Sequence, residues 1–178
     1  MPRLVVPVTD RDHTIGPGDA PVTLVEYGDY QCPYCVMAYP VVGELLRRRQ
    51  GTVRFAYRHF PLTNVHPFAE MAAEAAEAAG AQRRFWPMHD WLFEHQDELD
   101  AATIVTAAEA LGLDGEAIAE AIRGHRYLER VRSDFIGGVR SGVNGTPAFL
   151  VNAVRHGGGY SVDELEFAVD EAAADAER

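Results

Sequence analysis

The sequence of 178 residues contains no lysine, so all 16 of its basic residues are arginine, against 27 acidic residues. The absence of lysine excludes a lysine-dependent phosphate-binding loop, Schiff-base catalysis and the catalytic lysine of a protein kinase. The net charge of −11 argues against nucleic acid or an anionic membrane as a partner, because both attract clustered positive charge. The two cysteines are too few for a disulfide-stapled scaffold or a four-cysteine zinc site.

Long apolar stretches are also missing from the sequence. No run approaches the roughly 20 residues that a membrane-spanning helix needs. Pro7 interrupts the apolar residues near the start, so we predict no secretory leader. We therefore expect a cytoplasmic protein without a membrane partner. A hydrophobic content of 47% is enough for a sizeable core, and the length predicts one domain with or without a large insertion.

Strand-like and helix-like patterns divide the chain into three parts. Residues 1–19 are predicted to form an irregular lead-in with turn-forming glycine and proline. Strand patterns occur within residues 20–62 and 142–178, each with a helical stretch beside them, while residues 63–141 show helical segments that end mostly at glycine. Pro67 is predicted to be the first residue of a helix, and the run Ser161-Val162-Asp163-Glu164 predicts a capping box at the start of the last helix. This order predicts an α/β core, residues 20–62 and 142–178, interrupted by a helical insertion, residues 63–141.

The paired cysteines, Cys32 and Cys35, enclose Pro33 and Tyr34 at the predicted junction between a strand and a helix. A helix N-terminus stabilises a thiolate through its unpaired N–H groups and dipole, and thiolate is the nucleophile of disulfide exchange. Because one helical turn brings the two sulfurs within disulfide range, we expect an exposed Cys32 to attack and a deeper Cys35 to resolve the mixed disulfide. Pro33 suits the first helical turn, where its missing N–H costs nothing.

A purely structural thiol pair, or half of a zinc site, is the alternative for these cysteines. A zinc site needs two more ligands, and the nearest histidine spacing in the sequence is that of His89 and His95. On a helix, residues six apart are separated by about 600° of rotation and point well apart. We therefore expect no metal. For His59 and His66, packing or surface roles are expected in preference to catalysis.

Glu26 interrupts the apolar strand pattern six residues before Cys32. A strand of this length would put its side chain beneath the start of the helix, where burial raises the pKa of a carboxyl group. Glu26 is therefore a candidate to accept the Cys35 proton, directly or through a water, as that thiol attacks. The alternative is that Glu26 faces solvent from an edge strand or pairs with an arginine.

Taken together, these residues resemble the DsbA-like branch of the thioredoxin superfamily over residues 20–174. The matching features are Glu26, the run Cys32-Pro33-Tyr34-Cys35, Pro40 in the following helix, Gly145-Thr146-Pro147, and the runs 57–62 and 111–114. The resemblance implies a thioredoxin-like fold with a helical insertion domain. It also implies a cis Thr146–Pro147 bond facing the sulfurs, with the Thr146 backbone open to an extended substrate segment.

The resemblance further implies a protein disulfide oxidoreductase whose redox centre is the Cys32–Cys35 disulfide, with no other cofactor. Its partners would be protein or small-molecule thiols and disulfides and an unidentified recycling partner. Tyr34 stands where strongly oxidising relatives carry histidine, so we expect a potential below the value of about −120 mV of such oxidants. Two alternatives stay open: a redox-inactive binding module of thioredoxin fold, and a glutathione-dependent relative of the kappa-class transferases and isomerases.

Overall fold

The structure is a computed structural model that describes residues 2–176 and 178. Contacts within the chain divide it into two compact units. The first, here the sheet unit, contains the residues up to Gly28, Met37–Arg58 and the residues from Ile136 onward. The second, here the helical unit, contains Asp29–Val36 and His59–Phe135. The helices α1 (Pro33–Arg48) and α6 (Leu128–Arg140) contribute residues to both units.

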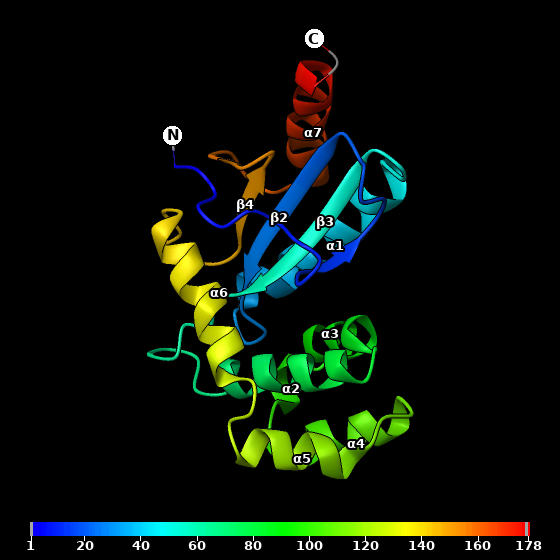
Figure 1. The fold of residues 1–178 in the computed structure, drawn as a ribbon, viewed down its shortest axis with the longest axis vertical. Coiled ribbons are helices and arrows are strands. Elements are labelled where there is room, and N and C mark those ends of the chain that lie inside the picture. The colour runs from blue at the N-terminus through cyan, green and yellow to red at the C-terminus, as the bar shows by residue number, and fades with distance from the viewer. Residues whose placement is uncertain (1, 177) are drawn as a thin grey trace. The chain divides into compact units, whose positions relative to one another are not determined.

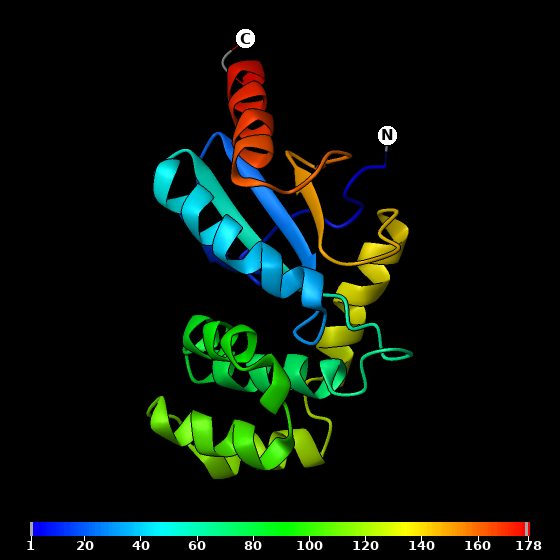
Figure 2. The ribbon, with the colours of Figure 1, turned by 180° about the vertical axis from the view of Figure 1, so that it is seen from behind.

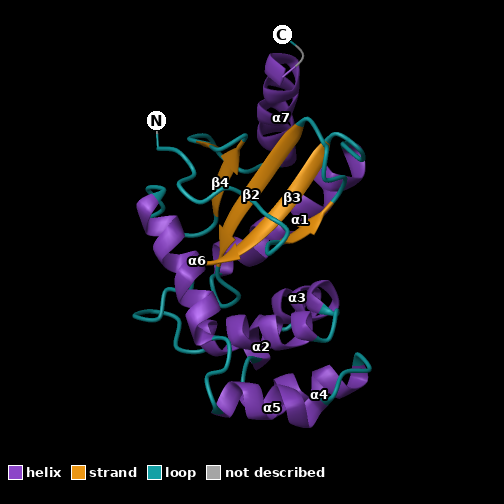
Figure 3. Cartoon of the chain, viewed as in Figure 1, coloured by secondary structure: helices purple, strands orange, loops and turns teal. Residues whose placement is uncertain are grey.

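The sheet unit is built on five strands in the order β1-β3-β2-β4-β5. Their bounds are β1 (His13–Ile15), β2 (Val22–Gly28), β3 (Val53–His59), β4 (Ala148–Val151) and β5 (Val154–Arg155). The arrowheads of β2 and β3 point the same way (Figure 1), as expected for strands joined through a helix. The pairs β1–β3, β2–β4 and β4–β5 are antiparallel. All five strands belong to one mixed sheet (Figure 3).

Two helices accompany this sheet. The part of α1 that belongs to the sheet unit crosses β2 and β3 (Figure 2), and α7 (Val162–Ala176) contacts β2 and β4. An ion pair connects the two helices, because the guanidinium of Arg49, just after α1, lies 2.7 Å from the carboxylate of Asp170 on α7. The largest buried side chains of the unit are Tyr27, Tyr57, Phe55, Leu24, Leu45, Leu150 and Leu165.

The start of the chain differs from the prediction of an irregular lead-in at residues 1–19. His13–Ile15 forms the edge strand β1, and Arg3 forms an isolated bridge to Val154. The segment is held by Arg58, whose buried guanidinium contacts both carboxylate oxygens of Asp12 at 2.7 and 3.1 Å. Three residues without hydrophobic alternation carry no strand signal of their own, and pairing to β3 makes them a strand.

The helical unit consists mainly of short helices. Their bounds are α2 (Ala69–Ala81), α3 (Phe85–Glu94), the 3-10 helix η1 (Gln96–Glu98), α4 (Ala101–Ala110) and α5 (Gly115–Arg123). The alanine-rich α2 is almost entirely buried and packs against α3, α4 and α5. Its small side chains allow close helix approach, so that α2 lies at the centre of this unit although it also buries Glu74 and Glu77. The predicted start at Pro67 is two residues too early, and η1 was not predicted.

A tight turn and a helix cap shape the last part of the chain. Asn152 and Ala153 both have positive φ angles, 43° and 68°, and connect β4 to β5 as a tight hairpin turn. Before α7, the Ser161 hydroxyl and the Glu164 carboxylate exchange hydrogen bonds with each other's backbone N–H, which confirms the predicted capping box. Within the described part of the chain, none of the helices has the length and apolar character to cross a membrane.

Candidate active site

The two cysteines lie at the start of α1, inside the helical unit. The Cys32 carbonyl accepts hydrogen bonds from the N–H groups of Cys35 and Val36, at 3.0 and 3.2 Å, so Cys32 occupies the cap position of the helix. Pro33 is therefore the first helical residue, as predicted, and its missing N–H leaves no donor unsatisfied. Cys35 follows within the first turn, where backbone N–H groups and the helix dipole favour negative charge.

The burial of Cys32 corrects our expectation that it is exposed. Its relative exposure is 3% and that of Cys35 is 0%, whereas Tyr34 between them is 61% exposed. The tight turn that ends at Cys32, closed by a hydrogen bond from its N–H to the Asp29 carbonyl at 3.1 Å, accompanies this burial. The dipeptide Pro33-Tyr34 thus presents the surface of the motif, and the sulfurs lie beneath it.

The loop before the cysteines is fastened by the carboxylate of Asp29. One oxygen, Oδ1, accepts the N–H of Gln31 at 2.8 Å. The other, Oδ2, accepts the N–H of Leu62 at 2.8 Å and lies 2.7 Å from Nδ1 of His66. The Asp29 side chain is fully buried, so these contacts replace its hydration. Asp29 therefore ties the turn that carries Cys32 to the segment after β3.

The next two residues are held by other elements of the helical unit. The Tyr30 hydroxyl lies 3.0 Å from Nδ1 of His89 on α3, and its carbonyl accepts a hydrogen bond from Gln96 of η1 at 3.2 Å. The side-chain oxygen of Gln31 accepts the N–H of Phe68, just before α2, at 2.8 Å. Each residue from 29 to 31 is thus connected to a different part of the helical unit, and we call this stretch the clamped loop.

Two predicted site features lie together in the sheet unit. Glu26 is 3% exposed on β2, a strand with neighbours on both sides, which excludes the alternative of a solvent-facing edge position. It is in register with Phe149 of β4. The Thr146–Pro147 bond, immediately before β4, is cis, as the resemblance implied. The role of Glu26 as proton acceptor, and that of Thr146 and Pro147 in substrate binding, stay predictions.

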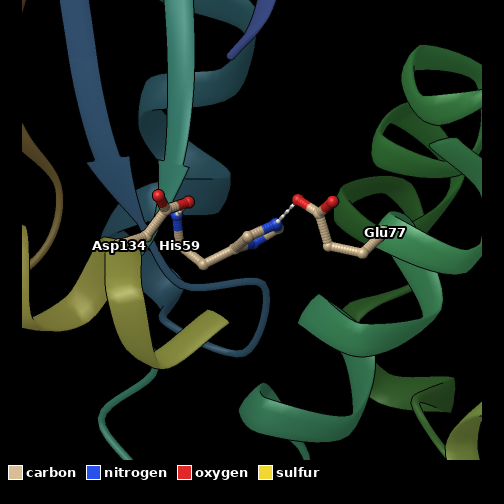
Figure 4. Close-up of side chains that lie close together, drawn as sticks. All are labelled: His59, Glu77 and Asp134. Atoms are coloured by element: carbon tan, nitrogen blue, oxygen red, sulfur yellow. Dashed lines mark hydrogen bonds and ion pairs between the residues drawn. The ribbon is translucent and has the colours of Figure 1, made fainter. Parts of the chain in front are cut away.

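A buried cluster of His59, Glu77 and Asp134 is the strongest candidate for a metal site among the described residues (Figure 4). Their ligand atoms all lie within 4.8 Å of one another. His59 Nε2 is 2.9 Å from Glu77 Oε1, and the backbone N–H of His59 donates to Oδ2 of Asp134 at 3.2 Å. Arg130 donates to the other Asp134 oxygen at 2.6 Å.

Arg130 already supplies a positive charge to this cluster, with its Nε also 3.8 Å from Glu77. Burial nevertheless outweighs the attraction of His59 and Arg130 and raises the pKa of Asp134 above its usual value. Because the hydrogen bonds join the end of β3 to α2 and α6, we assign the cluster a structural role. His59 is therefore a packing residue, as expected, and its partners Glu77 and Asp134 were not anticipated.

Asp29 was not anticipated from the sequence, and His66 was expected only in a packing or surface role. A short polar residue directly after a strand often binds a backbone N–H two residues on, and this signal would have found the contact with Gln31. No sequence pattern connects Asp29 with His66, because 37 residues separate them and both lie in irregular segments.

Comparison with known proteins places these features in a family. The profile of the thioredoxin family matches residues 8–171. A Na(+)/H(+) antiporter NhaA 1 of Salinispora arenicola is 51% identical over 172 residues, which are 96% of this chain and 26% of that protein. The corresponding antiporter of Mycolicibacterium vanbaalenii is 40% identical over 166 residues, 92% of this chain and 27% of that protein. The chain thus spans about a quarter of the length of the curated relatives it matches.

Solved structures give the same fold. BdbD from Bacillus subtilis superposes with a TM-score of 0.84 at 22% identity, over 92% of this chain and 93% of that one. A thioredoxin-like oxidoreductase from Silicibacter pomeroyi has a TM-score of 0.81 at 28% identity, with the same coverage of 92% and 93%. Alpha-DsbA1 of Wolbachia pipientis has a TM-score of 0.83 at 20% identity, over 98% and 96% of the two chains. The chain therefore belongs to the thioredoxin family, shares the fold of DsbA-like structures, and carries a CXXC pair at Cys32 and Cys35.

Proposed function

We propose that the chain exchanges disulfides with protein or small thiol substrates through its Cys-Pro-Tyr-Cys dithiol. The observation that carries the proposal is the position of the pair, with Cys32 capping α1 and Cys35 in its first turn. A helix N-terminus lowers the energy of a thiolate, and the two sulfurs one turn apart suit a reversible disulfide.

The reaction proceeds in two exchange steps. The Cys32 thiolate attacks one sulfur of a substrate disulfide, so a mixed disulfide forms and one substrate thiolate leaves. The Cys35 thiolate then attacks the Cys32 sulfur, which forms the Cys32–Cys35 disulfide and releases the second substrate thiolate. The dithiol loses two electrons and the substrate gains them. Run in reverse, the same steps oxidise a substrate dithiol. A reducing partner would recycle the protein in the first direction and an oxidising partner in the second.

Residues of the sheet unit supply two further roles in this proposal. Glu26, a buried carboxyl group, accepts the proton of Cys35 as that thiol becomes a nucleophile. The backbone of Thr146, before β4, pairs with an extended segment of the substrate. Tyr34 offers no positive charge to the Cys32 thiolate, so the potential should lie below the value of about −120 mV of a strong oxidant.

Reduction of a neutral disulfide such as dithiodipyridine by the reduced protein tests the proposal. We expect Cys32→Ser to abolish the reaction and Cys35→Ser to stop after the first step, with one substrate half bound covalently to Cys32 and visible by mass spectrometry. Asp19→Ser, a change at an exposed loop residue, serves as the control and should react as the wild type does. Exchange that survives Cys32→Ser would refute the dithiol mechanism. Glutathione turnover that persists in Cys35→Ser would favour the kappa-class alternative.

A second candidate function is redox control of ion antiport, which the antiporter relatives favour through their 51% identity to this chain. In this candidate the dithiol exchanges with cysteines of a Na(+)/H(+) antiporter and changes its transport rate. Vesicles containing the Salinispora arenicola antiporter, with the reduced or the oxidised chain added, provide the measurement. An antiport rate that does not depend on the redox state of the chain would exclude this function.

A further inference from the structure

A groove of about 580 Å³ lies next to the cysteine motif in the helical unit. Gln31 and Pro33, the two neighbours of Cys32, form one side of it. The groove is completed by Phe68 before α2 and by the segment from Gln96 to Asp100, which includes η1. An occupant of this groove would therefore lie beside the residue that attacks the substrate disulfide.

The walls of the groove are fixed by hydrogen bonds. Gln31 accepts the N–H of Phe68 at 2.8 Å, which joins the clamped loop to the start of α2. Gln96 donates to the Tyr30 carbonyl at 3.2 Å, which joins the same loop to η1. Asp100 caps α4 by accepting the N–H and the hydroxyl of Thr103 at 3.0 and 2.6 Å. The groove is thus formed in advance of binding, and its walls lose little conformational entropy when a ligand enters.

Three carboxylates, Asp97, Glu98 and Asp100, give the groove its charge. Asp97 and Glu98 are exposed and form no ion pair with any described residue, unlike Glu44 or Glu116, which pair with arginines. The hydrogen bonds from Thr103 lower the pKa of Asp100, which favours its charged form. None of the described residues that line the groove is cationic.

We propose that this acidic groove binds the substrate segment next to the reacting cysteine and selects segments that carry arginine or lysine. The proposal rests on the proposed disulfide exchange and names its substrate class. Uncompensated carboxylates attract a cationic side chain, while Pro33, Phe68 and Leu99 provide apolar surface for its aliphatic stem. Disulfide exchange itself accepts any accessible disulfide, and the groove makes the protein prefer substrates with basic residues next to the reacting cysteine.

Two short peptides test this preference, each with a single cysteine held in a disulfide with 2-mercaptoethanol. One peptide carries arginines beside the cysteine, and the other carries glutamates at the same positions. We expect the reduced protein to react faster with the basic peptide. The double variant Asp97→Asn/Glu98→Gln should lower the ratio of the two rates about tenfold, or about threefold for each exposed charge removed. High salt, near 1 M, should remove the preference in the wild type because it shortens the Debye length to about 3 Å.

The matched control is Glu120→Gln/Glu129→Gln, which removes the same charge from exposed positions outside the groove. An equal fall in this control, or an unchanged ratio in the groove variant, would overturn the proposal. So would loss of the preference on adding Ca²⁺ at constant ionic strength, because the groove would then be a metal-ion site. Reduction of neutral dithiodipyridine separates the two proposals. If it fails in the wild type, disulfide exchange itself is wrong, whereas exchange without charge preference contradicts the groove alone.

Discussion

Asp29 offers the sharpest test of how the cysteine motif is held in place. Its buried carboxylate accepts the N–H groups of Gln31 and Leu62 and contacts the ring of His66. The substitution Asp29→Asn keeps the shape of the side chain but leaves only one acceptor oxygen. The asparagine keeps the most contacts when its oxygen points toward Leu62 and His66. Its NH₂ group then faces the N–H of Gln31, and the hydrogen bond to Gln31 is lost.

The magnitude follows from the number of bonds lost. A hydrogen bond to a charged group contributes about 1.5–3 kcal/mol, so Asp29→Asn should lower the free energy of unfolding by about that amount. His66→Ala removes one contact from a partly exposed ring and should cost about 1–2 kcal/mol. Asp29→Ala leaves all three partners without an acceptor, a loss comparable with the whole stability of about 5–15 kcal/mol of a typical domain. We expect this third variant to be largely unfolded.

Urea unfolding of the wild type, the two single variants Asp29→Asn and His66→Ala, and the double variant measures these values. The double variant should cost less than the sum, because the contact with His66 is already weakened once Asp29 has lost its charge. Asp19→Asn, an exposed control, should stay within about 0.5 kcal/mol of the wild type. The rate of disulfide exchange should also fall in Asp29→Asn, by up to about 100-fold if the turn before Cys32 moves by about 1 Å. Unchanged stability together with additive effects would refute the anchoring role of Asp29.

Three other substitutions test the fold. Burial raises the pKa of Asp134, so just above the usual carboxyl pKa of about 4 the folded protein still holds a proton that the unfolded chain has released. The free energy of unfolding should therefore fall as the pH rises through this range. Asp134→Asn should flatten this decline when unfolding is measured against pH, and an unchanged slope would contradict the prediction. Burial alone would lower the pKa of Arg58, but the hydrogen bonds that Arg58 donates to Asp12 and Tyr27 raise it, so Arg58→Met, which takes the guanidinium away from the Asp12 carboxylate, should cost about 3–5 kcal/mol; a loss below about 1 kcal/mol in urea unfolding would show that the N-terminal segment contributes little. Ala153→Gly should raise stability by up to about 1 kcal/mol, since a positive φ of 68° suits glycine better, and a lower melting temperature would speak against this.

Features with a local pattern could be predicted from the sequence. The apolar run before Cys32 and the helical spacing after it placed the dithiol at a strand-to-helix junction, and Pro33 marked the first helical residue. The spacing of Ser161 and Glu164 predicted a capping box that the structure confirms. Each of these depends on residues only a few positions apart, where sequence distance and spatial distance are nearly the same.

Features made by distant residues could not be predicted in this way. The contact of Asp29 with His66 has no periodicity, and a histidine in an irregular segment gives no sign of its partner. Strand β1 exists because it pairs with β3, not because His13–Ile15 prefers an extended form. The burial of Cys32 depends on how the preceding turn folds, so the position of the residue at a helix start did not reveal it.

The clamped loop has a consequence for backbone motion around the cysteines. The N–H groups of Gln31, Leu62 and Phe68 lie outside regular helices and strands, yet each donates to a side-chain oxygen of the loop. Such amides exchange hydrogen with water only when those bonds open, and Asp29 serves two of the three. We therefore expect slow exchange at all three amides in the wild type, and faster exchange at Gln31 in Asp29→Asn, where the acceptor of its N–H is lost. Motion of the backbone next to Cys32 therefore depends on hydrogen bonds to side chains, and not on those of a regular helix or strand.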